Sequence, residues 1–465
     1  MNSATRGGIY MKEKIVAGKT LPQWIKSTPL MKEIIQTNEI FWINPNKKEF
    51  IEANKQVDYT KQDIDDAEAR LDRFASYLKI AFPETEPTNG IIESELTPII
   101  EMKKILEKQT NTRIQGNFLL KRDDTLPIAG TIKARGAIYE VLKHAETIAL
   151  ESGLLPSFEE DYAIFASDEF KDFFAKHKIA VGTTGNLGIS VGTVGAKLGF
   201  EVTVHMSVEA KKWKKDFLRS RGVTVIEHES DFTKAVEQGR AESKADPASY
   251  FVDDEHSVDL FLGYTVAGNR LKVQLENEGV LVDEDHPLFV YLPCGIGGSP
   301  GGITFGLKQV YGDHVHCFFA EPTHTPSMLV GLVTQQYDGV SVKDFGIDGH
   351  TCADGLAVPR TSGFVAKVME NFFSGSYTVR DEETYHLLAS LADNESIFLE
   401  PAAVAGIPGA ARLFATPEGQ EYLAANQLAN KMSQATHIAW ATGGSMVPET
   451  DRKEFYLQGT IKSSE

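Results

Sequence analysis

Short apolar runs alternate with longer polar or amphipathic stretches along most of the chain. The runs are three to five residues long and rich in valine, isoleucine and phenylalanine, which is typical of buried strands. They lie at residues 118–121, 179–181, 201–205, 223–226, 288–291, 316–319 and 437–440. Because parallel strands need a crossover between them, usually a helix, the alternation predicts an α/β fold with parallel sheets wrapped by helices.

The first 90 residues or so differ from this pattern. They are polar and are expected to be mostly helical, with the clearest amphipathic stretch at residues 63–74. A piece containing proline and threonine, residues 82–90, is typical of a connection. A chain of 465 residues can bury a large core, so two or three domains are expected.

One lysine stands at a place where a lysine can become reactive. Lys133 follows Pro127 and Gly130 and opens an apolar stretch, residues 137–142, that is typical of a helix. The positive end of a helix dipole, with partial desolvation, disfavours the ammonium form. An uncharged lysine amine attacks carbonyls and forms Schiff bases, so Lys133 is a candidate nucleophile. The ordinary alternative is a solvated surface lysine.

A small polar turn, Gly182–Gly188, lies between the apolar run 179–181 and a helix-like stretch. A strand, a turn and a helix in this order aim backbone N–H groups at an anion. Thr183 and Thr184 add hydroxyl groups, and Asn186 adds an amide. The alternative is an ordinary N-cap turn.

A second turn is glycine-rich, with five glycines among residues 295–302. Such a loop folds tightly round a phosphate and presents consecutive N–H groups to it. It is neither a Walker loop nor a dinucleotide fingerprint, so a single phosphate is the better fit, and a merely flexible loop is the alternative.

Near the C-terminus, Thr442 follows an apolar run. A threonine at the carboxyl end of a strand can donate its hydroxyl to a ring nitrogen, or it can simply precede a glycine turn.

Together these motifs resemble those of the pyridoxal-phosphate enzymes of fold type II, the tryptophan synthase β-like group. Nearly the whole chain resembles the bacterial D-serine dehydratase (D-serine ammonia-lyase) family. The stretches that carry this likeness are 90–96, 130–142, 185–188, 202–206, 251–255, 293–298, 313–322, 353–358 and 440–448. Ser299 and His256 depart from the residues common in that family and are expected to tune substrate choice or rate.

The resemblance implies a carbon–nitrogen lyase that converts D-serine to pyruvate and ammonia by α,β-elimination, with pyridoxal 5'-phosphate held as a Schiff base on Lys133. It implies Lys133 and Thr184 as catalytic residues and Glu321 as a ligand of a cation such as potassium, a solvated loop carboxylate being the alternative for Glu321. The residues implied to bind the cofactor are Lys133, Asn186, Gly295, Ile296, Gly297, Gly298 and Thr442. Those implied to bind the substrate are Thr183, Thr184, Gly185, Asn186 and Leu187.

The same resemblance divides the chain into a helical N-terminal extension, a large cofactor-binding domain and a small domain that closes over the cofactor. These are residues 1–90, residues 91–150 with 266–465, and residues 151–265. Other functions stay open: an L-serine or L-threonine dehydratase, a β-replacement synthase, a non-enzymatic protein that buffers pyridoxal phosphate, and a nucleotide-binding regulator.

Composition limits the classes of partner that the protein is expected to bind. The chain has 47 basic and 65 acidic residues and a net charge of −18, which argues against nucleic acid and anionic membranes. The basic cluster Lys211–Lys215 is expected to be a solvated helix face. Three cysteines form no disulfide framework, and there is neither a long apolar span nor a secretory signal, so a cytoplasmic enzyme is expected. Its expected partner is a small D-amino acid, and it is expected to be a monomer or a small homo-oligomer.

Overall fold

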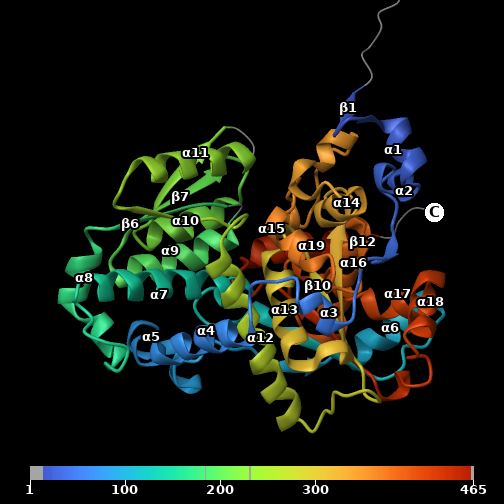
Figure 1. Cartoon of the computed structure of the whole chain (residues 1–465), viewed down its shortest axis with the longest axis horizontal. Coiled ribbons are helices and arrows are strands. Elements are labelled where there is room, and N and C mark those ends of the chain that lie inside the picture. The colour runs from blue at the N-terminus through green and yellow to red at the C-terminus, as the bar shows by residue number, and fades with distance from the viewer. Residues whose placement is uncertain (1–13, 184, 230–231, 462–465) are drawn as a thin grey trace, which may run out of the picture.

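The computed structural model describes residues 14–183, 185–229 and 232–461. Two parallel-stranded sheets, each covered by helices, dominate these residues and lie side by side in the molecule (Figure 1). A short hairpin, β1 (Ile15–Val16) and β2 (Lys19–Thr20), stands apart from both sheets near the N-terminus. The predicted α/β class with parallel sheets is confirmed.

The larger sheet has seven strands in the order β3-β12-β11-β10-β13-β5-β4. Its inner strands run parallel, and the two edge strands run antiparallel to their neighbours. The strands are β3 (Phe41–Ile43), β4 (Leu96–Pro98), β5 (Asn117–Arg122), β10 (Leu288–Pro293), β11 (Val315–Pro322), β12 (Gly375–Val379) and β13 (Thr436–Ala441). Successive side chains of β10 enter two different apolar clusters, Val290 one and Tyr291 the other, so the sheet is buried on both faces.

The smaller sheet has four parallel strands in the order β8-β7-β6-β9. They are β6 (Lys178–Gly182), β7 (Glu201–Ser207), β8 (Thr224–His228) and β9 (Ser249–Val252). The helices that join them are α9 (Asn186–Leu198), α10 (Lys212–Ser220) and α11 (Phe232–Ala245). The seven predicted strands are all present, whereas β3, β4, β9 and β12 were not predicted.

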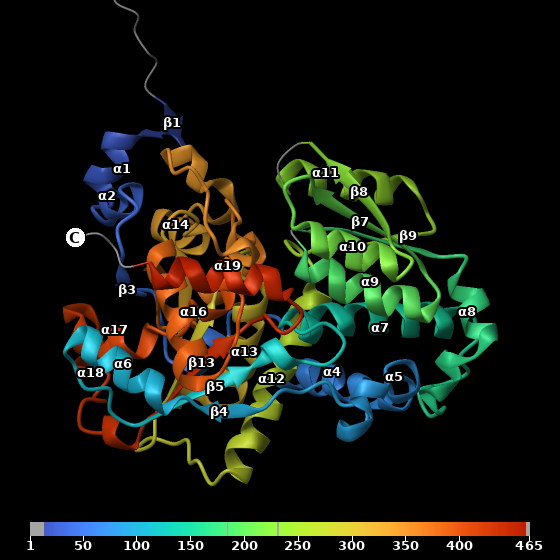
Figure 2. The same ribbon diagram turned by 180° about the vertical axis from the view of Figure 1, so that it is seen from behind.

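Two long helices connect the sheets. Helix α7 (Lys133–Glu151) lies under α9, and α4 (Lys61–Arg73) and α5 (Ala75–Ala81) lie on its other side (Figures 1 and 2). Helix α12 (Val258–Asn277) follows β9 and packs against α13 (Gly298–Tyr311). Glycine makes this contact close, because a methyl group added at Gly306 would lie 2.0 Å from the carbonyl oxygen of Thr265. The start of α13 is thereby fixed relative to the loop before α12.

The N-terminal part docks on α7 through one buried carboxylate. Glu146 accepts hydrogen bonds from Arg70 Nε at 2.5 Å, Arg73 Nη2 at 2.7 Å and Tyr162 Oη at 2.6 Å. The segment before residue 90 is mostly helical, although β3 from it completes one edge of the large sheet. The division into three domains at residues 90, 150 and 265 stays a prediction.

The remaining helices surround these elements. They are α1 (Leu21–Ser27), α2 (Leu30–Ile35), α3 (Phe50–Asn54), α6 (Ile100–Thr110), α8 (Asp168–Phe174), α14 (Ser327–Thr334), α15 (Gly363–Met369), α16 (Asp381–Glu395), α17 (Gly409–Ala415), α18 (Pro417–Ala425) and α19 (Glu449–Thr460). Within the described ranges, no helix has the length and apolar character needed to cross a bilayer.

Candidate active site

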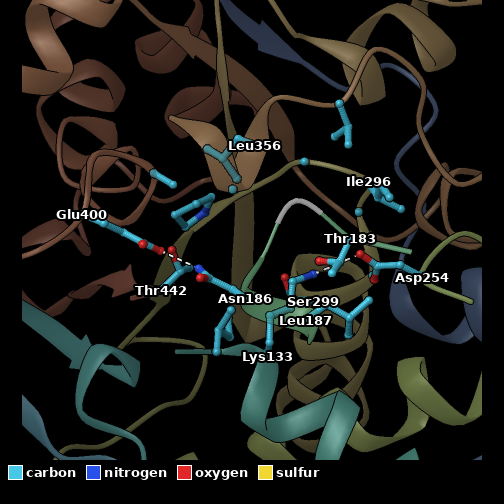
Figure 3. Close-up of a pocket in the computed structure, with 18 residues that line it drawn as sticks. Lys133, Thr183, Asn186, Leu187, Asp254, Ile296, Ser299, Leu356, Glu400 and Thr442 are labelled. Carbon is cyan, nitrogen blue, oxygen red and sulfur yellow. Dashed lines mark hydrogen bonds and ion pairs between the residues drawn. The ribbon is translucent and has the colours of Figure 1, made fainter. Parts of the chain in front are cut away.

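A cavity between the two sheets collects most of the residues that the sequence singled out (Figure 3). The first turns of α7, α9 and α13 border it, and so do the carboxyl ends of β10 and β13. The predicted residues that line it are Lys133, Thr183, Asn186, Leu187, Gly295, Ile296, Gly297, Gly298 and Thr442. Gly185 belongs to the same loop without lining the cavity, Glu321 does not line it, and Thr184 lies outside the described residues.

Lys133 is the first residue of α7, and the turn before it is fastened to the end of β13. Ile132 N donates to Thr442 O at 2.8 Å, and Thr131 forms a β-bridge with Gly443. The Lys133 side chain is 19% exposed, and its Nζ lies 3.3 Å from Asp254 Oδ2. The lysine amine therefore faces the cavity, with a carboxylate as its counter-ion.

A buried ion pair fixes the direction of α7 two residues further on. Arg135 Nε donates to Asp123 Oδ2 at 2.6 Å, and Trp440 Nε1 donates to the same oxygen at 2.7 Å. Asp123 follows β5, and Trp440 lies on β13. Because a buried charge is expensive unless it is paired, this arrangement holds the helix start tightly against two strands of the large sheet.

Asp254, in the loop between β9 and α12, was not among the predicted site residues. Its neighbours Asp253 and Glu255 both accept hydrogen bonds from Arg240, at 2.8 Å each, so the middle carboxylate alone of these three lines the cavity. Asp254 Oδ1 is buried and has no hydrogen-bond partner among the described residues. A run of three acids between a strand and a helix was the signal in the sequence, but only the fold shows which of them faces Lys133.

The glycine-rich loop becomes the first turn of α13. Gly297 is its N-cap with a φ of +110°, a conformation that side chains rarely allow. The N–H groups of Gly297, Gly298 and Ser299 donate to no acceptor in the part of the chain that the structure describes. Three free N–H groups at the positive end of a 14-residue helix form an anion site of the size of one phosphate.

The opposite end of the cavity holds an amide and a carboxyl group. Asn186 Nδ2 donates to Glu400 Oε1 at 2.8 Å, while Asn186 Oδ1 is buried without a partner among the described residues. Burial raises the pKa of Glu400, although the nearby Lys214 ammonium acts in the other direction. Figure 3 shows Glu400 and Thr442 next to Asn186 on this side. Glu400 was not predicted, because 214 residues separate it from Asn186.

These groups fit pyridoxal phosphate. The free N–H groups of the α13 turn suit its phosphate, and the partnerless Asn186 Oδ1 and the Thr442 hydroxyl suit the polar edge of its ring. The Lys133 amine suits its aldehyde. Apolar side chains for the ring faces come from Ile132, Ile296, Leu356 and Val358.

Glu321 is fully buried in β11, so the alternative of a solvated loop carboxylate is wrong. Its carboxylate accepts hydrogen bonds from Met328 N at 2.8 Å, Leu329 N at 3.1 Å and Ser376 Oγ at 2.8 Å. Burial raises the pKa of Glu321 to about 8. The carboxylate thus supports the start of α14, and its predicted role as a cation ligand stays a prediction.

The basic cluster Lys211–Lys215 is only partly a solvated face. Lys211 and Lys212 are exposed, as expected, but Lys214 is 2% and Lys215 6% exposed. The prediction is wrong for these two lysines because each has a carboxylate partner, Asp354 for Lys214 and Glu227 for Lys215.

The chain is similar over most of its length to known proteins. Residues 95–424 match the family model described as pyridoxal-phosphate dependent enzyme. The chain is 56% identical to a probable D-serine dehydratase of Geobacillus stearothermophilus, over 94% of this chain and 95% of that protein. It is 57% identical to the protein of the same name from Geobacillus kaustophilus, over 92% of this chain and 96% of that one.

Two solved structures share the fold at low sequence identity. Holo diaminopropionate ammonia lyase from Escherichia coli is 16% identical, with a TM-score of 0.67 over 91% of this chain and 98% of that one. The processed threonine deaminase isoform 2 of Solanum lycopersicum is 19% identical, with a TM-score of 0.58 over the same shares of the two chains. Both support the fold type II architecture.

Proposed function

The chain belongs to the family of pyridoxal-phosphate dependent enzymes, and from this premise we propose that it is a lyase that converts D-serine to pyruvate and ammonia. The observation that carries the proposal is the single cavity in which Lys133 and Asp254 lie within 3.3 Å of each other, bordered by the free N–H groups of the α13 turn. The choice of D-serine as substrate rests on the relatives named probable D-serine dehydratase, which match this chain over nearly its whole length.

The residues that would hold the cofactor follow from the fit. Lys133 would bind its aldehyde, the N–H groups of Gly297, Gly298 and Ser299 would bind its phosphate, and Asn186 and Thr442 would bind the ring. When bound, the cofactor withdraws electrons from the α-carbon of the substrate, so that a proton there becomes acidic. Thr442 has a neutral hydroxyl, which holds the ring nitrogen less strongly protonated than an aspartate would, and this suits fast loss of a β-substituent.

The substrate carboxylate would lie against the first turn of α9. Thr183 and residues 185–187 offer hydroxyl and N–H donors at the positive end of that helix. Thr184 in this loop stays a proposed participant. With the carboxylate held here, the α-carbon would lie beside Lys133 and Asp254.

Two side chains would then move the protons. The Lys133 amine takes the α-proton as a general base. Asp254, whose Oδ2 lies 3.3 Å from Lys133 Nζ, passes this proton on to the β-hydroxyl, which leaves as water. Hydrolysis of the remaining carbon–nitrogen bond gives pyruvate and ammonia, so one water is lost and one is consumed. We place this reaction in the cytoplasm, in a monomer or small homo-oligomer, with Glu321 as a ligand of a cation such as potassium.

Pyruvate release from D-serine and L-serine, measured side by side on the holoenzyme, tests the proposal. We expect turnover of D-serine at least a hundredfold faster than that of L-serine. Turnover of L-serine alone would overturn the stereochemical part. No pyruvate from either, with cofactor bound, would replace elimination by a β-replacement reaction or by storage of pyridoxal phosphate.

A further inference from the structure

Behind the wall of the cavity lies a buried lysine whose role the proposed reaction leaves open. Lys214 of α10 is 2% exposed, and its Nζ lies 3.0 Å from Asp354 Oδ2. Burial alone would lower the pKa of this amine, but the carboxylates of Asp354 and Glu400 outweigh burial and raise it. Lys214 is therefore a charged side chain in the interior. Burial of a charge costs free energy, and an ion pair offsets this cost only in part.

The Lys214 side chain runs along the backbone of the loop that would grip the substrate carboxylate. A methyl group added at Gly185 would lie 2.3 Å from Lys214 Cδ and 3.2 Å from its Nζ. Gly185 N in turn donates to Thr183 Oγ1 at 2.9 Å. Lys214 does not line the cavity itself, so it contacts the loop from outside.

The partner of Lys214 belongs to the facing wall. Asp354 directly precedes Gly355, Leu356 and Val358, which line the cavity and come from the part of the chain that carries the large sheet. Helix α10 lies beside α9 on the small sheet (Figures 1 and 2). The ion pair therefore joins two walls of the cavity that otherwise belong to different sheets. The hydrogen bond from Asn186 to Glu400 spans the same gap.

We propose that Lys214 is a positioning residue: its ion pair with Asp354 holds Thr183 and residues 185–187 against the facing wall, so that the donors for the carboxylate of an amino acid are in place. This role rests on the proposed function for the identity of the substrate. Without the pair the loop separates from residues 354–358, and the carboxylate binds weakly.

A matched control lies one residue further along α10. Lys215 is also buried, and its Nζ lies 2.7 Å from Glu227 Oε2 and 2.9 Å from Val208 O. Glu227 lies on β8, and Val208 directly follows β7, so this ion pair stays beside the small sheet and does not span the cavity. Loss of either lysine removes one buried charge. Asp354 then keeps no cationic partner among the described residues, whereas Glu227 keeps Arg219 at 2.7 Å.

The experiment compares Lys214→Met, Lys214→Arg, Lys215→Met and Asp354→Asn as holoenzymes. KM and kcat for D-serine are measured, together with the affinity for D-alanine and L-alanine from the absorbance of the bound cofactor. Alanine carries the carboxylate but no leaving group, so its binding is observed without elimination. Thermal unfolding of each variant reports its stability.

We expect Lys214→Met and Asp354→Asn to raise KM and weaken alanine binding at least about tenfold, with a smaller change in kcat. Lys214→Arg should restore part of the loss, and a double variant that combines Lys214→Met with Asp354→Asn should be no worse than either single variant. Lys215→Met should lower the melting temperature but leave KM within about twofold.

Equal changes in alanine affinity for Lys214→Met and Lys215→Met, or none for Lys214→Met and Asp354→Asn, would overturn the positioning role. If Lys214→Met does not fold, Asp354→Asn and Lys214→Arg decide the question. Failure of the wild type to release pyruvate from D-serine would instead overturn the proposed function, while alanine binding still tests Lys214.

Discussion

Replacing Asp254 by asparagine separates two roles of this carboxyl group. Asparagine keeps the shape of the side chain and its ability to accept a hydrogen bond from Lys133 at 3.3 Å. It removes the charge and the ability to take up and pass on a proton. Asp254 Oδ1 is buried and has no partner among the residues described, so in the wild type it is free to meet the β-hydroxyl.

The size of the effect follows from the chemistry. A positioned general acid contributes about 10²–10⁴-fold, which corresponds to about 2.7–5.4 kcal/mol of activation free energy. At 3.3 Å and an effective dielectric constant near 20, the attraction between the carboxylate and the Lys133 ammonium is about 5 kcal/mol before solvation is subtracted. The free energy lost when Lys133 is held differently is therefore of similar size. A lower rate with D-serine alone cannot show whether the missing proton transfer or the altered position of Lys133 is the cause.

A second substrate distinguishes them. Chloride leaves β-chloro-D-alanine without a proton, so Asp254→Asn should lower kcat for D-serine about 10²–10⁴-fold but for the chloro compound less than about tenfold. Both rates come from the same pyruvate assay. Asp253→Asn is the control, because that neighbour pairs with Arg240, and a loss below about threefold is expected. Equal losses of Asp254→Asn on both substrates would refute proton donation to the hydroxyl.

Three further predictions concern the phosphate turn, the N-terminal part and the cation. Gly297→Ala should weaken pyridoxal phosphate binding about 5- to 30-fold in equilibrium dialysis, because a side chain at a φ of +110° costs about 1–2 kcal/mol. Glu146→Ala should lower the free energy of unfolding in urea by about 3–5 kcal/mol, because two arginines lose a buried partner, whereas a loss below about 1 kcal/mol would contradict that docking. Since burial raises the pKa of Glu321 to about 8 from an ordinary 4.5, its proton stabilises the fold fully below pH 4.5, and this contribution falls as the pH rises to 8. Without potassium, Glu321→Gln should therefore be more stable than the wild type between pH 5 and 8. Potassium should raise the melting temperature of the wild type but not that of Glu321→Gln. An equal rise in both proteins would contradict a cation at Glu321.

Local sequence patterns predicted the strands that are continuous apolar runs. Strand β12 was missed because it begins with glycine and serine, and β3 was missed because it has only three residues at the sheet edge. Both depend on their neighbours in the sheet more than on their own propensity.

In the site, too, local sequence predicted some residues, while others depend on contacts with distant parts of the chain. Lys133 and the α13 turn were predicted because their chemistry follows from the adjacent sequence. Asp254 and Glu400 were missed because each acts on a residue far away in the chain, 121 positions for Asp254 and 214 for Glu400. The buried Lys214 was misjudged because a run of basic residues on a helix does not indicate which of them meets a carboxylate.

Reduction of the holoenzyme with sodium borohydride, followed by peptide mapping, tests the central claim most directly. Borohydride fixes the cofactor to the amine that holds it, and mass spectrometry locates that amine. We expect the pyridoxyl group on Lys133 and no pyruvate from D-serine after Lys133→Ala. A label on another lysine, such as Lys214, or undiminished pyruvate release by Lys133→Ala, would contradict the assignment of the active site.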